Sequence, residues 1–150
     1  MKKVWMLIVL FCIFATGCNN EFARAEYDVT EKIVKTEDRY AKKMSVFNSI
    51  EGGYKLTASK FDGRETLWSG KAEENQSMDV KVNFQLSKGQ AKLVHIDGED
   101  NLTTVIECLP DTSTDDYVTK TVFLTKGKNR FKVVGYDCED MKLQILFEAP

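Results

Sequence analysis

The residues that could carry out chemistry are few, and the single histidine, His95, is the first of them. A general base or a Ser-His-Asp arrangement in this chain would have to use it. His95 lies in the run Leu93-Val94-His95-Ile96, which is typical of a strand, and it faces the same side as Leu93. The chain has no GxSxG or HExxH motif and no glycine-rich phosphate loop. The sequence therefore predicts a packed histidine and a protein that is not an enzyme. A carboxylate pair assembled by folding is the alternative left open.

Acidic residues in two loops could ligate a metal ion. Alternate connections of an antiparallel sheet lie at the same end, and two strands separate the loops 111–116 and 137–140. Calcium takes about six to eight oxygen ligands, which two such loops could supply. Calcium is thus the candidate cofactor, and no other cofactor is expected; an ordinary solvated, charged surface is the alternative. The candidate ligands are Asp111, Asp115, Asp116, Asp137, Glu139 and Asp140.

Two cysteines of the mature chain, Cys108 and Cys138, fall at this same predicted end of the sheet. An even pair in an exported domain is often oxidised. A disulfide between them would stabilise the fold by about 3–4 kcal/mol in the chain-entropy model. We predict this disulfide, and two buried free thiols are the alternative. The lack of a CxxC motif and of a Cys/His cluster argues against the common structural zinc sites.

Aromatic residues could provide a flat, polar-rimmed platform for sugar rings. Trp68 is the central candidate, although a tryptophan next to Leu67 in a strand is commonly a core residue. The predicted ligand-binding residues are Trp68, Tyr54, Tyr117 and Tyr136.

Alternating hydropathy predicts the elements that must position these residues. Met78 to Leu86 alternates apolar and polar residues without a fault, and Met141 to Glu148 repeats the pattern, which is typical of half-buried strands. Turn signals occur about every ten residues and predict eight or nine antiparallel strands in an all-β sandwich resembling a jelly roll. A helix over 27–41, followed by a short strand at 44–47, is the expected N-terminal addition. The other predicted strands cover 54–59, 65–69, 91–96, 102–108, 117–125 and 131–136.

One hairpin carries a resemblance to a known group of domains. Val122 to Val133, with Gly127 and Asn129 at its turn, resembles a late hairpin of galactose-binding-like and carbohydrate-binding jelly-roll modules. The resemblance implies the fold, and in those modules ligands lie in loops or on one open face. A shared fold does not by itself imply a shared function.

The N-terminus has the layout of a secretory signal peptide. Lys2 and Lys3 precede an apolar run from Val4 to Ala15, which is too short for an ordinary membrane-spanning helix. The segment Ala15-Thr16-Gly17-Cys18 resembles the lipobox of bacterial lipoproteins. That resemblance implies cleavage before Cys18 and its modification with a diacylglyceryl group. Ordinary secretion and an uncleaved anchor are the alternatives.

The expected organisation is a signal peptide over 1–17, a lipidated cysteine and tether over 18–25, and one sandwich domain over 26–150. Removing residues 1–17 takes away Lys2 and Lys3, so 19 basic and 23 acidic residues remain, and the net charge changes from −2 to −4. This mildly acidic composition argues against nucleic acid as a partner. We therefore expect a non-catalytic protein held by a lipid anchor, carrying acyl chains such as palmitate, on the extracytoplasmic face of the cell membrane. The expected partner is a polysaccharide, or alternatively a protein of an envelope complex.

Overall fold

Two long strands, β3 (Gly53–Ala72) and β8 (Gly127–Glu148), form the centre of the fold in the computed structural model, which describes residues 21–148. They pair antiparallel along nearly their whole length, from Gly53 opposite Leu146 to Ala72 opposite Gly127. A register shift between Phe61 and Gly63 marks a β-bulge, which bends a strand and increases its twist. Each long strand therefore contributes to both layers of a sandwich.

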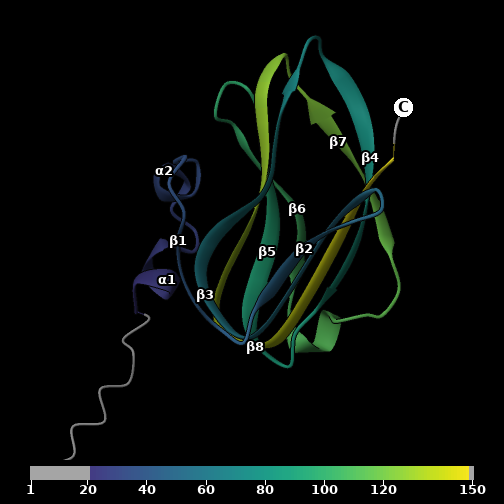
Figure 1. Cartoon of the computed structure of the whole chain (residues 1–150). Coiled ribbons are helices and arrows are strands. Elements are labelled where there is room, and N and C mark those ends of the chain that lie inside the picture. The colour runs from purple at the N-terminus through teal and green to yellow at the C-terminus, as the bar shows by residue number, and fades with distance from the viewer. Residues whose placement is uncertain (1–20, 149–150) are drawn as a thin grey trace, which may run out of the picture.

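The remaining strands extend each layer outward from this central pair. One layer has the order β6-β5-β8-β3-β1 and the other β7-β4-β8-β3-β2 (Figure 1). Within residues 21–148, all strand pairings are antiparallel, and the eight strands found there confirm the predicted jelly-roll-like all-β sandwich. The other described elements are α1 (Glu21–Glu26), α2 (Thr30–Ile33), β1 (Arg39–Lys43), β2 (Val46–Ile50), β4 (Gln76–Gln85), β5 (Lys88–Ile96), β6 (Leu102–Cys108), the short 3₁₀ helix η1 (Pro110–Thr112) and β7 (Val118–Leu124).

The main core lies between the two layers and follows the alternation in the sequence. Val80 and Val82 of β4 and Ile145 of β8 are fully buried. The residues that alternate with them along each strand face outward. Burial of one such side chain contributes roughly 1.5–3 kcal/mol relative to its exposure. The pattern that predicted the strands is therefore the pattern that packs the layers together.

The N-terminal residues form a cover on the outer face of the β5-β8-β3 layer. Tyr27 and Ile33 are buried, and they pack in a second core with Val94, Ile96 and Val134 of that outer face. Figure 1 shows α1 and α2 beside this layer. The long helix predicted over 27–41 is wrong: α2 has only four residues, and 39–43 and 46–50 are edge strands paired with β3.

Ion pairs fix this cover to buried cations of the sheet. Lys92 contacts the Asp28 carboxylate at 2.7 Å, and Lys132, which has no exposed side-chain surface, contacts Asp38 at 3.2 Å. Burial among other cations lowers the pKa of Lys132 from its ordinary value, although Asp38 opposes the shift. The N-terminal segment thus both covers these lysines and supplies their carboxylate partners, so it is an integral part of the fold.

Residues 21–25, which were predicted to belong to a tether, lie in α1, and Ala23 is buried. The signal peptide and the lipidated Cys18 lie outside the described residues. Within residues 21–148, no helix is both long and apolar enough to cross a membrane.

Candidate functional site

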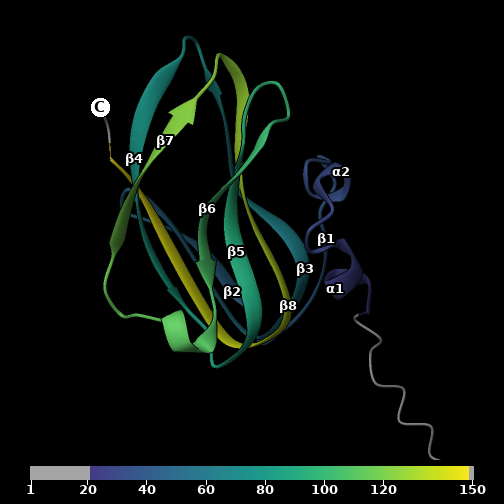
Figure 2. The same cartoon turned by 180° about the vertical axis from the view of Figure 1, so that it is seen from behind.

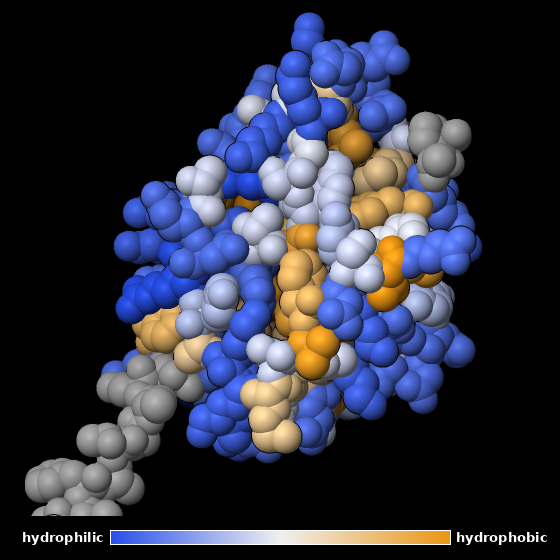
Figure 3. Space-filling model, in the orientation of Figure 1, coloured by the Kyte–Doolittle hydropathy of each residue, from blue (hydrophilic) through white to orange (hydrophobic). Residues whose placement is uncertain are grey.

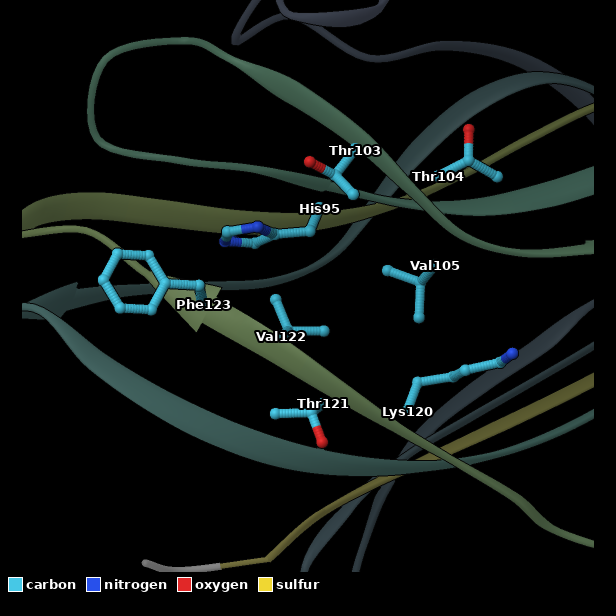
Figure 4. Close-up of a pocket in the computed structure, with 8 residues that line it drawn as sticks. All are labelled: His95, Thr103, Thr104, Val105, Lys120, Thr121, Val122 and Phe123. Atoms are coloured by element: carbon cyan, nitrogen blue, oxygen red, sulfur yellow. The ribbon is translucent and has the colours of Figure 1, made fainter.

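A hollow on the domain lies between the edge strands β6 and β7. Among the described strands, β6 pairs only with β5 and β7 only with β4, so the two strands form the open side of the sandwich. Figure 2 brings both strands to the front. The groove has a volume of about 400 Å³. Its lining residues are His95, Thr103, Thr104, Val105, Lys120, Thr121, Val122 and Phe123 (Figure 4).

Strand alternation decides which side chains reach this groove. Lys120 lies opposite Val80 in the β4–β7 ladder, and paired residues of a ladder share a face, so Lys120 lies on the inward face of β7. Val122 follows on the same face and is buried, whereas Phe123 is 56% exposed at the rim. β7 thus supplies an amine inside the groove and an aromatic ring at its mouth.

His95 closes the inner end of the groove and is held rigidly there. Its ring is 2% exposed, its Nε2 lies 3.0 Å from Asn129 Oδ1, and it contacts the Phe131 ring at 5.1 Å between centroids. Burial lowers the pKa of His95, despite the opposing effects of Asn129 and the Asp97 charge. The imidazole is therefore neutral near pH 7. The structure confirms the packed histidine expected from the sequence.

The side chain of Asn129 is hydrogen-bonded to the backbone of the preceding loop. Its side-chain amide donates to the carbonyl oxygens of Thr125 and Gly127, at 2.7 and 3.0 Å. The amide orientation is thereby fixed, so its Oδ1 accepts a hydrogen bond from His95. These contacts give His95 a structural partner, an amide oxygen in place of the carboxylate that orients the histidine of a catalytic triad.

The groove can form hydrogen bonds and one stacking contact with a ligand. Thr103 and Thr104 of β6 provide hydroxyl groups, Lys120 provides three donors, and Phe123 provides an exposed aromatic face. This mixture fits a hydroxyl-rich, partly apolar molecule. None of these residues was singled out from the sequence, because no local pattern shows that β6 and β7 face each other.

The predicted calcium ligands do not form a site. Asp137 pairs with Arg24 at 2.7 Å, Glu139 contacts Lys60 and Lys88, and the Asp140 carboxylate accepts a hydrogen bond from Ser87. In the other loop, the backbone carbonyl of Asp115 accepts a hydrogen bond from Asn83, and its carboxylate accepts one from Gln85. Asp111 lies in η1, and Asp116 follows later in the same loop. Within residues 21–148, no group of three or more histidine, cysteine or acidic side chains is placed to hold a metal ion. Four of the six carboxylates, those of Asp115, Asp137, Glu139 and Asp140, instead contact side chains of the domain itself.

The predicted disulfide is also absent, because Cys108 and Cys138 are both buried free thiols. The Cys108 Sγ lies 3.3 Å from the Phe84 carbonyl oxygen, and the Cys138 Sγ lies 3.3 Å from the Gln90 carbonyl oxygen. β5 passes between the two strands that carry them, with Ala91 paired to Cys108 on one side and to Gly135 on the other. Burial raises the pKa of Cys138 to about 12 and also raises that of Cys108. Both thiols therefore stay protonated and unreactive.

The four predicted sugar-binding aromatics form no common platform, although Trp68 and Tyr54 both contact Phe147. Trp68 packs between the layers against Phe131 and Phe147, and Tyr54 stacks on Phe47 at the sandwich edge. The other two do not join them. Tyr136 contacts Tyr27 under the N-terminal cover, whereas Tyr117 is 42% exposed and its hydroxyl donates to Gln144. The exposed ring at the groove is Phe123.

Comparison with known proteins gives structural likenesses only. No protein-family model matches the chain, and no curated protein matches it. The chain is similar to a carbohydrate-binding module of Cellvibrio mixtus lichenase 5A, solved with cellotriose, at 13% identity, covering 81% of this chain and 94% of that one with a TM-score of 0.46. It is also similar to a CBM35 from Paenibacillus barcinonensis, at 16% identity, 74% and 93% coverage and a TM-score of 0.40. An exo-beta-1,3-galactanase from Phanerochaete chrysosporium matches at 13% identity and a TM-score of 0.41, covering 75% of this chain and 27% of that one.

Proposed function

We propose that this protein is a lipid-anchored binding module on the extracytoplasmic face of a bacterial membrane, and that a polysaccharide chain occupies the groove between β6 and β7. The observation that carries this proposal is the groove itself, which combines hydroxyl groups, an amine and an exposed aromatic ring along an open edge. Sugar rings present both hydroxyl groups and apolar C–H faces, so this combination is complementary to them. The lipobox resemblance supports the location.

The chemistry of the groove supports binding without catalysis. His95 is the one residue lining the groove whose ordinary pKa suits acid–base catalysis near neutral pH, and it is neutral, buried and hydrogen-bonded to Asn129. None of the residues that line the groove is acidic, so it lacks the carboxylate pair that most glycoside hydrolases use. The proposed role is therefore to hold a polymer.

The test is a binding titration of the protein from residue 18 onward, with Cys18→Ser to remove the lipid site. Calorimetry with a panel of wall and extracellular polysaccharides should identify a ligand, which should also raise the melting temperature because it binds the native state. Phe123→Ala should weaken binding by about tenfold, equivalent to about 1.4 kcal/mol, because the stacking face is lost.

The matched control is Tyr40→Ala, which removes an aromatic ring of similar exposure, 44%, from β1 outside the groove. It should bind as the unsubstituted protein does. Failure of the whole panel to bind, or equal affinity of the Phe123→Ala variant, would show that the groove is not a polysaccharide site.

A protein partner is the second candidate, and an exposed apolar edge favours it. Met44 is 87% exposed and Val46 is 53% exposed along the β1–β2 edge. In that case the protein would act as a subunit of an envelope complex, and this edge would be its contact surface.

A further inference from the structure

The strand β2 presents a free edge with exposed apolar side chains. Among the strands of residues 21–148, it pairs only with β3, so its other side has open backbone donors and acceptors. Val46 is 53% exposed and Phe47 is 40% exposed. Figure 3 shows a narrow band of apolar atoms in the middle of the face where Figure 1 places β2, with hydrophilic atoms around it.

β2 differs from the other edge strands in lacking any charge. Edge strands are usually protected from pairing with other chains by lysine, other charged residues or proline. β1 carries Arg39 and two lysines, β6 carries Glu107, and β7 carries Lys120. The sequence of β2, VFNSI, contains no charged residue and no proline. This edge alone is unprotected among the described strands.

We propose that β2 pairs antiparallel with β2 of a second copy of this chain. Full overlap of the five residues places Asn48 opposite its own symmetry mate and Val46 opposite Ile50 of the partner. These three residues share the outer face of β2, because side chains alternate along a strand. An asparagine amide can donate to and accept from its copy, and the flanking apolar side chains pack across the two strands.

The charges at the two ends of the strand favour the same pairing. Lys43 precedes β2 and Glu51 follows it, whereas the neighbouring Lys42 is paired with Glu65 of the same chain. Antiparallel pairing of two copies brings the lysine end of each chain to the glutamate end of the other. Both Lys43 and Glu51 are exposed. The layer β7-β4-β8-β3-β2 would then continue into that of the partner as one sheet.

A five-residue strand gives a small interface, since specific stable complexes bury about 1,200–2,000 Å². The dimer is therefore weak and is best trapped covalently. We would place a cysteine at position 48 with Asn48→Cys in cells that produce the full-length protein, oxidise them mildly and separate the extract without reductant. Asn48→Cys should give a band of doubled mass.

The matched control is Thr119→Cys, an exposed position on the β7 edge. The unsubstituted protein gives the background from native cysteines, of which Cys108 and Cys138 are buried. Asn48→Cys should cross-link several-fold more than either control. Equal cross-linking of Asn48→Cys and Thr119→Cys would reflect random encounter and would overturn the proposal.

Charge exchange tests the orientation of the pair. In the Asn48→Cys background, Glu51→Lys and Lys43→Glu should each lower dimer yield by roughly fivefold, because each places like charges together twice per dimer. The double exchange should restore the yield. If each single exchange lowers the dimer yield and the double exchange does not restore it, the antiparallel arrangement is overturned. The polysaccharide titration is independent of this result, since the groove lies at β6 and β7.

Discussion

At the scale of single residues, His95 is expected to make the fold sensitive to mild acid. Its buried ring has a pKa lowered from the ordinary value of 6.5, so the unfolded chain binds a proton at a higher pH than the folded chain does. The free energy of unfolding should therefore fall as the pH drops below about 6.5. His95→Gln keeps a side chain able to hydrogen-bond Asn129 and removes this titration.

Urea denaturation at pH 7.5 and pH 5.5 measures the effect. The unsubstituted protein should lose stability between the two values, and His95→Gln should lose less, although it starts lower by about 1–3 kcal/mol because packing against Phe131 is disturbed. The carboxylates with lowered pKa, such as Glu26 and Asp97, start from ordinary values of 4.5 and 3.8 and titrate below this window. An equal loss in both proteins would assign the acid sensitivity to other groups.

The burial of an individual side chain was predictable where it depended only on the alternation of residues along its own strand. The alternation around Leu93 placed His95 in the core before any tertiary contact was known. Connection parity placed Cys108 and Cys138 at the same end of the sheet, but it cannot reveal that β5 lies between their two strands. The groove residues Thr103 and Lys120 depend on the meeting of two distant edges, so no local pattern marks them.

At the scale of elements, the strands of the core were predictable, whereas in the N-terminal segment only the short strand predicted at 44–47 overlaps an observed strand, β2. Tyr40, Met44 and Phe47 lie close to helical spacing, yet this segment becomes β1 and β2 because the long β3 offers it hydrogen-bond partners along both halves. Tertiary pairing outweighs a weak local preference. The two halves of β3 and of β8 were predicted as separate strands, since a bulge interrupts the alternation without ending the ladder.

The N-terminal cover should contribute strongly to stability. Ile33, which is 1% exposed, anchors α2 in the second core. Ile33→Ala should lower the free energy of unfolding by about 2–5 kcal/mol through lost burial and an unfilled cavity. Met44→Ala, at an 87% exposed site, should change it by less than about 0.5 kcal/mol. Chemical denaturation of both variants measures the difference, and similar values would mean that the cover is only loosely attached.

At the scale of the whole molecule, the proposed lipid anchor and the docked helix α1 together restrict the position of the domain. Only Asn19 and Asn20 separate Cys18 from the first residue of α1, and a span of three residues reaches at most about 11 Å. Arg24 of α1 is tied to Asp137 of β8, and Ala23 is buried against the sheet. A lipidated chain should therefore hold the α1 side of the domain against the bilayer.

Insertion of ten glycine and serine residues between Asn20 and Glu21 would test this arrangement. The insertion should leave the melting temperature unchanged, because it adds chain outside the packed cover. A fluorophore at Thr119→Cys on β7 should transfer less energy to a headgroup dye once the longer linker lets the domain move away from the bilayer. The Cys18→Ser variant should show no transfer, since it lacks the anchor. Equal transfer with and without the insertion would mean that the domain contacts the membrane through its own surface, independently of the short N-terminal connection.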